Sequence, residues 1–179
     1  MKDKKIGVLI GLTACCILIV GLVILFSGRE GRLIKKADSL YNAGKYEEAA
    51  VTYEKALGKS HNEKAVYGLV ASLMTYDKEA AKGKIVSATD TLCKAGLKLT
   101  EGQKKTLTEL FLLTPEIMAD DNALCYETLV KGFELLEKPG ELKPALADVA
   151  LFVGKYDEAL LYSDGAESVK EAIEKLTTK

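Results

Sequence analysis

The stretch from residue 33 to residue 57 predicts two short helices joined by a tight turn. Its apolar side chains recur at the i, i+3, i+4 and i+7 spacing that places them on one face of a helix. In the first helix they are Leu33, Ile34, Ala37, Leu40 and Tyr41, and in the second they are Tyr46, Ala49, Ala50, Tyr53, Ala56 and Leu57. Gly44 separates the two runs, where a helix end often needs a left-handed backbone. Because both faces must be buried, we expect the helices to fold back on each other.

The same turn returns near the C-terminus. Residues 154–159 read Gly-Lys-Tyr-Asp-Glu-Ala and parallel Gly-Lys-Tyr-Glu-Glu-Ala at residues 44–49 position for position. The two turns lie 110 positions apart, which leaves room for two further hairpins. We expect these hairpins at residues 63–76 with 80–97, and at 101–113 with 116–137. Residues that favour turns fall at the ends of these segments, namely Gly96, Gly102, Pro115, Pro139 and Gly140.

A final helix is predicted at the C-terminus. Asp164 and Glu167 have the spacing of a capping box, in which side chains satisfy the first backbone N–H groups of a helix. Val169, Ile173 and Leu176 then share one face, while Lys, Glu and Thr occupy the other. We expect the apolar face to be buried and the polar face to end the stack of hairpins.

The first hairpin resembles a tetratricopeptide repeat (TPR), a helical hairpin with a period of about 34 residues. The matching residues are Ala37, Gly44, Tyr46, Ala49, Tyr53 and Ala56, and in the last hairpin Gly154, Tyr156 and Ala159. One such repeat cannot bury its own outer face, so members of the family stack several. The resemblance therefore implies an all-α, TPR-like α-solenoid at residues 33–179, with about four antiparallel hairpins and a capping helix.

An apolar segment precedes the hairpins. Ile6 to Phe26 are 21 residues without a charge, and at about 1.5 Å per residue such a helix spans the roughly 30 Å hydrocarbon core of a bilayer. Lys2, Lys4 and Lys5 flank it on one side. We therefore expect a polar tail at 1–5, one transmembrane helix at 6–26 and a juxtamembrane connection at 27–32.

Three alternatives to a retained anchor stay open. The segment is also compatible with a buried helix of a soluble domain, or with a cleaved signal peptide, although Phe26-Ser27-Gly28 lacks the usual small-x-small ending. Leu12-Thr13-Ala14-Cys15 resembles a bacterial lipoprotein processing site, in which Cys15 would be lipidated. The residues after Cys16 stay apolar where a mature lipoprotein turns polar. We favour the anchor and a bacterial origin.

The charges on the two flanks of the segment nearly balance, so they do not decide its orientation. A single N-terminal anchor with a very short leading segment commonly keeps that segment in the cytoplasm. By this analogy we expect an extracytoplasmic helical domain, with the cytoplasmic side as the alternative. Gly7 and Gly11 form a small-residue stripe that allows two membrane helices to pack closely, so a homodimer through these residues is one further hypothesis.

The sequence contains no pattern typical of catalysis, a cofactor or a metal. The single histidine, His61, falls in a polar turn between two hairpins, and the paired acids Glu47-Glu48, Asp120-Asp121 and Asp157-Glu158 are expected in first helical turns, where they compensate the helix dipole. Cys93 and Cys125 lie singly within helical patterns, either as two separate thiols on apolar faces or as a bridge between adjacent helices. We therefore expect no enzyme, no cofactor and no metal site.

Protein partners remain the expected ligands. Beyond residue 5 the chain has 22 basic and 25 acidic residues, a net charge of −3, which disfavours nucleic acid. The resemblance implies a partner-binding groove formed by the first helices of the hairpins, at Asp38, Tyr41, Asn42, Ser72, Thr75 and Tyr76. The sequence favours a membrane-tethered scaffold for protein–protein interaction and complex assembly. The alternative is a structural subunit permanently buried in a membrane-associated complex, with no exchangeable ligand.

Overall fold

The computed structural model describes residues 28–58, 62–96 and 98–178. The predicted membrane segment at 6–26 lies outside these ranges, together with Gly7, Gly11, Cys15 and the polar tail. His61 lies outside them as well. Within the described ranges, no helix is both long and apolar enough to cross a membrane.

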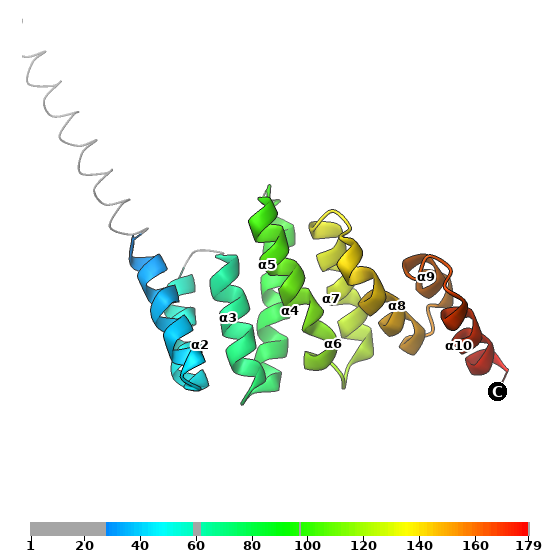
Figure 1. Ribbon diagram of the computed structural model, residues 1–179, viewed down its shortest axis with the longest axis horizontal. Helices are drawn as coiled ribbons and strands as arrows, with labels where there is room; N and C mark the ends of the chain where they lie inside the picture. The colour runs from blue at the N-terminus through cyan, green and yellow to red at the C-terminus, as the bar shows by residue number, and fades with distance from the viewer. Residues whose placement is uncertain (1–27, 59–61, 97, 179) are drawn as a thin grey trace, which may run out of the picture.

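The described residues form helices and turns, and no strand occurs among them (Figure 1). The first helix occupies residues 28–42, so the predicted connection at 27–32 is helical from residue 28. The helices that follow are α2 (Tyr46–Leu57), α3 (Glu63–Met74), α4 (Lys78–Ala95), α5 (Glu101–Leu112), α6 (Thr114–Ile117), α7 (Asn122–Leu135), the 3₁₀ helix η1 (Gly140–Leu142), α8 (Lys143–Phe152), α9 (Tyr156–Tyr162) and α10 (Glu167–Thr177). The predicted all-α class is confirmed.

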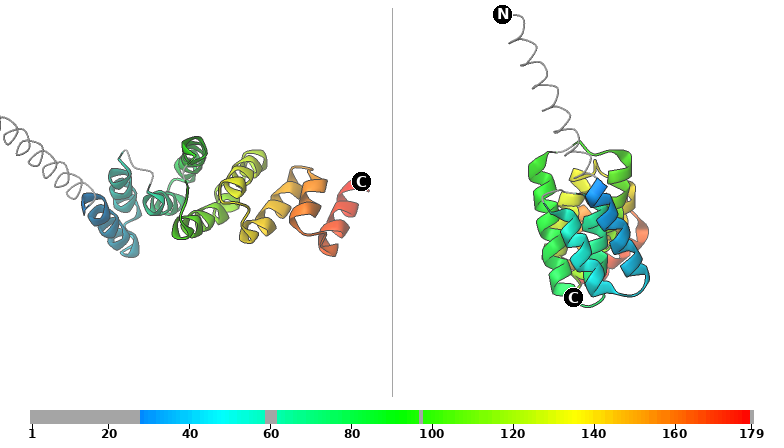
Figure 2. Two further views of the ribbon diagram at one scale, coloured as in Figure 1. Left: turned by 90° about the horizontal axis from the view of Figure 1, so that it is seen from above. Right: turned by 90° about the vertical axis from the view of Figure 1, so that its left-hand side faces the viewer.

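The helices stack as antiparallel hairpins along one long axis, and the two ends of the described chain lie at opposite ends of the array (Figures 1 and 2). The first helix pairs with α2, α3 with α4, α5 and α6 with α7, and α8 with α9, and α10 follows on α9. Successive hairpins touch through α3 with α5, α4 with α7, and α7 with α8. The array is therefore a TPR-like series of hairpins in which each unit buries the outer face of its neighbour.

The first and last hairpins turn in the same way. Gly44 and Gly154 both have a φ of +74°, in the left-handed region that favours glycine. The backbone N–H of Lys45 donates to the carbonyl of Leu40 at 3.0 Å, and that of Lys155 donates to the carbonyl of Ala150 at 2.8 Å. In both cases the lysine also approaches a glutamate three residues later at 3.3 Å. The repeated hexapeptide therefore specifies one local structure twice.

Replacing Gly44 or Gly154 with alanine is expected to lower the free energy of unfolding by about 1 kcal/mol each, because an L-residue is strained in the left-handed region. Open space surrounds both glycines, so strain is the only cost. Gly102→Ala is the matched control, because Gly102 lies in open space within α5 and has no positive φ. It should not lower the free energy of unfolding. Urea unfolding followed by circular dichroism measures all three. A clear loss in one turn and none in the other would contradict their equivalence.

The third hairpin differs from the prediction of one helix at 116–137. The short α6 ends at Ile117, and α7 begins only at Asn122. The side chain of Asp121 accepts a hydrogen bond from the backbone N–H of Leu124 at 3.0 Å, so it caps a new helix. Asp120 and Asp121 thus precede α7 instead of occupying its first turn, which corrects the interpretation of this acidic pair.

The predicted capping box at Asp164 and Glu167 is also wrong. Asp164 has a φ of +52° and its carboxylate pairs with Lys143 at 2.8 Å, while Ala166 precedes α10 without a side-chain cap. Val169 is buried and Ile173 packs partly against the core, but Leu176 is 53% exposed. The reason is length: α9 has seven residues and α10 has eleven, so α10 extends beyond the helix on which it packs.

Two glycines allow large aromatic rings to touch a helix backbone. On α3, a Cβ at Gly68 would lie within 2.7 Å of three ring carbons of Tyr53 from α2. On α7, a Cβ at Gly132 would meet three ring carbons of Phe111 from α5 at 2.7 Å. In the outer hairpins, the small residues Ala37, Ala49 and Ala159 are fully buried. These contacts fix how each helix is rotated against the next.

Candidate partner-binding groove

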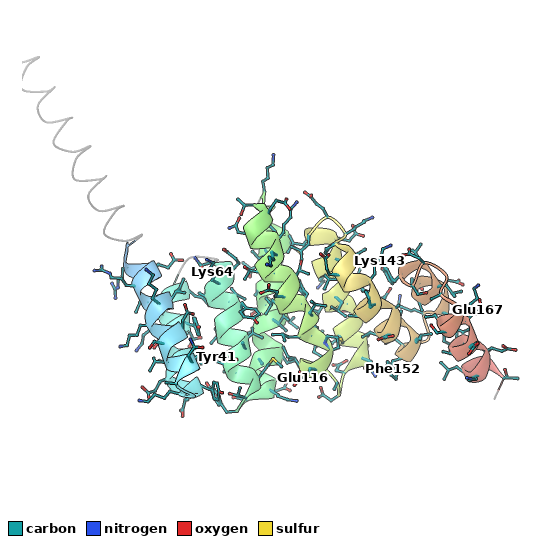
Figure 3. The ribbon with its side chains drawn as sticks, in the orientation of Figure 1. Tyr41, Lys64, Glu116, Lys143, Phe152 and Glu167 are labelled. Atoms are coloured by element: carbon teal, nitrogen blue, oxygen red, sulfur yellow. The ribbon has the colours of Figure 1, made fainter. Side chains whose placement is uncertain are left out.

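An open groove of about 450 Å³ lies between the first helix, α3 and α5, with α2 beneath it. We call it the groove and define it by six of its lining residues: Asp38, Tyr41, Tyr53, Lys64, Tyr67 and Glu109. Figure 3 labels Lys64 at the upper end of α3 and Tyr41 near the lower end of the neighbouring first helix. The groove therefore extends along the facing sides of these two helices.

The floor of the groove is a buried tyrosine held by a carboxylate. Tyr53 is 3% exposed, and its hydroxyl donates to Oδ1 of Asp38 at 2.6 Å. Burial, followed by the hydrogen bond to Asp38, raises the pKa of the Tyr53 phenol well above its ordinary value. The phenol thus stays protonated as a donor, and it orients the Asp38 carboxylate at the wall of the groove.

Two further tyrosines form the aromatic walls. Tyr67 is half-buried on α3, and its pKa is raised by burial and then by the nearby negative charge of Glu109. Tyr41 is also half-buried, and its ring packs edge-on against Tyr46, with 5.2 Å between the ring centroids. The groove therefore combines packed aromatic rings with two carboxylates, those of Asp38 and Glu109.

The predicted groove residues divide into two sets. Asp38, Tyr41 and Asn42 line the groove. The structure places Ser72, Thr75 and Tyr76 elsewhere. Ser72 is fully buried, and its hydroxyl donates a hydrogen bond to the carbonyl of Gly68 at 2.7 Å. The Thr75 hydroxyl donates to the carbonyl of Ser72. Tyr76 is 49% exposed beyond the end of α3.

Sequence reasoning missed Lys64, Tyr67 and Glu109. On α3, residues 64, 67, 68 and 71 have the i, i+3, i+4, i+7 spacing of one face and together line the groove. The contact between Gly68 and Tyr53 turns that face inward. The sequence shows this spacing, but it does not show which face of α3 turns toward the groove. That depends on the contact between Gly68 and Tyr53, which belong to two different hairpins.

A second groove of about 750 Å³ continues past Glu109 between α5, the end of α7 and η1. Its charged lining residues are Glu101, Lys104, Lys105, Glu109, Glu137 and Glu141. Lys104 connects two of them, with Nζ at 2.6 Å from Glu137 and 3.2 Å from Glu101. Hydrogen bonding to Lys104 lowers the pKa of Glu137 and raises that of the lysine. The two grooves share Glu109 as a lining residue, so they lie next to each other.

Cys93 and Cys125 do not form a bridge with each other. Both thiols are free: Cys93 is exposed near the end of α4, whereas Cys125 is buried within α7. Burial raises the pKa of Cys125 to about 11. The alternative of a Cys93–Cys125 disulfide is therefore wrong, and so is an apolar environment for Cys93. In the part of the chain that the structure describes, no group of three His, Cys, Asp or Glu side chains is placed to hold a metal ion.

Comparison with known proteins assigns no family. No family model matches the chain, and no curated protein matches it. Among solved structures, the chain is similar to a thermophilic TPR protein in Thermus thermophilus, at 16% sequence identity and a TM-score of 0.31, over 84% of this chain and 100% of that one. A likeness of this degree supports no argument about function, so the fold assignment depends on the helix pairing and the repeated turns described above.

Proposed function

We propose that the chain is a membrane-tethered, TPR-like scaffold that binds segments of other proteins in the groove and helps to assemble them at a membrane. The observation that carries this function is the groove itself. It is built from three successive hairpins, it is open to solvent, and it presents aromatic and charged side chains on rigid helices. None of the described residues that line it is His, Cys or Ser, and we propose that it binds without catalysis or a cofactor.

The membrane tether is the second part of the proposal. Support comes from the uncharged segment Ile6–Phe26 and its flanking lysines. A tether restricts the groove to a layer next to the bilayer and raises the local concentration of partners there. Binding that is weak in solution then becomes sufficient for recruitment. We propose that the helical domain faces away from the cytoplasm.

A permanently assembled subunit is the second candidate function. Three large apolar side chains are exposed near the C-terminal end of the array, Phe152 at 76%, Leu161 at 69% and Leu176 at 53%. Figure 3 labels Phe152 at the lower end of α8. A contiguous exposed apolar patch marks a surface for another protein, and in this alternative a fixed partner at this end would cover all three side chains.

Quantitative crosslinking separates the two functions. The full-length chain is purified in mild detergent, crosslinked and analysed by mass spectrometry. We expect several partners, each below one copy per chain, with crosslinks to lysines near the groove such as Lys64. One partner at a constant one-to-one ratio, crosslinked near α8 to α10, would contradict the scaffold and support the permanent subunit.

The exposed thiol of Cys93 tests the side of the membrane. We expect a membrane-impermeant maleimide to label the full-length chain in intact cells at Cys93, and a Cys93→Ser variant to lose the label. Cys125 should react more than tenfold more slowly, because it is buried and its pKa is raised to about 11. Labelling that appears only after permeabilisation would contradict the extracytoplasmic side.

A further inference from the structure

The surface formed by the two adjacent grooves carries unequal numbers of positive and negative charges. Five carboxylates line it, namely Asp38, Glu101, Glu109, Glu137 and Glu141. Three ammonium groups oppose them, namely Lys64, Lys104 and Lys105. Lys104 is held between Glu101 and Glu137, so these three groups largely neutralise one another. With five carboxylates against three ammonium groups the surface is net acidic, and charge of one sign in a concave surface concentrates ligands of the opposite sign.

Asp38 and Glu109 are the carboxylates best placed to meet a ligand. Asp38 extends from the first helix and Glu109 from α5, so they flank the groove from two different hairpins. Oδ1 of Asp38 accepts the hydroxyl of Tyr53, which leaves the other carboxylate oxygen available. Glu109 lies where the two grooves meet. A cationic group in the groove could therefore approach a carboxylate from either side.

The tyrosines make the groove selective for cationic side chains rather than for small cations. Tyr41 and Tyr67 line it together with Asp38 and Glu109. The face of an aromatic ring attracts an ammonium or guanidinium group through the negative potential of its π-electrons. The aliphatic stem of a Lys or Arg side chain also packs well on such rings. Carboxylates beside restrained tyrosines thus match a long cationic side chain.

We infer that the groove binds an extended segment of a partner protein that carries Lys or Arg side chains, with Asp38 and Glu109 as their counter-charges and Tyr41 and Tyr67 as their aromatic contacts. This inference rests on the proposed binding function of the same groove. Lys64 lies at the N-terminal end of α3, and its ammonium group repels other cations. It therefore limits how far the basic part of the bound segment extends toward that end. An acidic segment would instead face a net negative surface.

Matched peptide pools test the inference. The full-length chain in nanodiscs of neutral lipid is titrated with three fluorescent pools of nine-residue peptides, whose variable positions hold Lys and Arg, Asp and Glu, or Asn and Gln. We expect the basic pool to bind at least about tenfold more tightly than the acidic pool, with a difference that shrinks as salt is added. Equal binding of all pools would overturn the inference and leave the proposed function standing. No binding by any pool would overturn both.

Charge-neutral variants locate the binding site. Asp38→Asn keeps an acceptor for the Tyr53 hydroxyl, so it removes the charge without removing that hydrogen bond. Asp38→Asn and Glu109→Gln are each expected to weaken the basic pool about fivefold and to leave the neutral pool unchanged. Asp148→Asn on α8 and Glu116→Gln on α6, both exposed and outside the groove, are the matched controls. If the control variants weaken binding of the basic pool as much as Asp38→Asn and Glu109→Gln do, the groove is not the binding site.

Discussion

Replacing Phe111 with alanine is expected to lower the free energy of unfolding of the full-length chain by about 3–5 kcal/mol. The Phe111 side chain is completely buried, and its ring lies against the backbone of α7 at Gly132. Truncation leaves a cavity between α5 and α7 that the neighbouring helices cannot close without losing other contacts. Because α5 also packs on α3, the loss weakens the connection between the second and third hairpins.

Phe152→Ala is the matched control for this prediction. The same side chain is removed, but at 76% exposure, so the free energy of unfolding should change by no more than about 0.5 kcal/mol. Urea unfolding should be followed by circular dichroism and by limited proteolysis, because hairpin arrays can unfold in parts. A similar loss in both variants would contradict the burial of Phe111 as the cause.

Gly68→Ala is expected to lower the free energy of unfolding by about 2 kcal/mol. Alanine normally stabilises a helix interior relative to glycine, by about 0.5–1 kcal/mol. At Gly68, however, the new Cβ would lie within 2.7 Å of three ring carbons of Tyr53. The ring cannot move away easily, because it is 3% exposed and its hydroxyl is bonded to Asp38. The clash therefore outweighs the gain in helix propensity.

Gly83→Ala on α4 is the control, since open space surrounds Gly83. It should raise the free energy of unfolding by about 0.5–1 kcal/mol, so the two substitutions have opposite signs. Adding Tyr53→Ala should remove the extra cost of alanine at position 68, which a double-mutant cycle measures. Stabilisation by Gly68→Ala alone would show that Tyr53 does not pack against this backbone.

Local signals in the sequence predicted the outer hairpins well. Gly44 and Gly154 each follow an apolar run, at a point where a residue with left-handed backbone ends the helix easily. Both glycines adopt this left-handed backbone. The third hairpin was harder, because helical periodicity continues through residues 114–121. A turn at residues 118–120 and the side-chain cap of Asp121 separate α6 from α7 there. The free energy by which a side-chain cap favours a new helix start over continuation of the old helix is small. The spacing of apolar residues does not reveal it.

The groove was predicted only in part for a different reason. The resemblance to the repeat family predicted Asp38 and Tyr41 as groove residues, and both line the groove. Tyr67 was missed, because the rotation of α3 depends on the contact between Tyr53 and Gly68. The sequence shows the spacing of the groove face on α3, but it gives no sign of the contact between hairpins that turns this face inward. The predicted membrane segment at 6–26 lies outside the described residues and stays a prediction.

Site-specific photocrosslinking tests the central claim, that the groove is where protein partners bind. The photoreactive residue p-benzoylphenylalanine replaces Tyr67, inside the groove, or Tyr76, which is exposed outside it. Both variants exchange one aromatic residue for another in the full-length chain, within membranes of the source cells. We predict discrete protein adducts from position 67 that the basic peptide pool competes away, and none of these adducts from position 76. The same adducts from both positions, or none from position 67, would contradict the account.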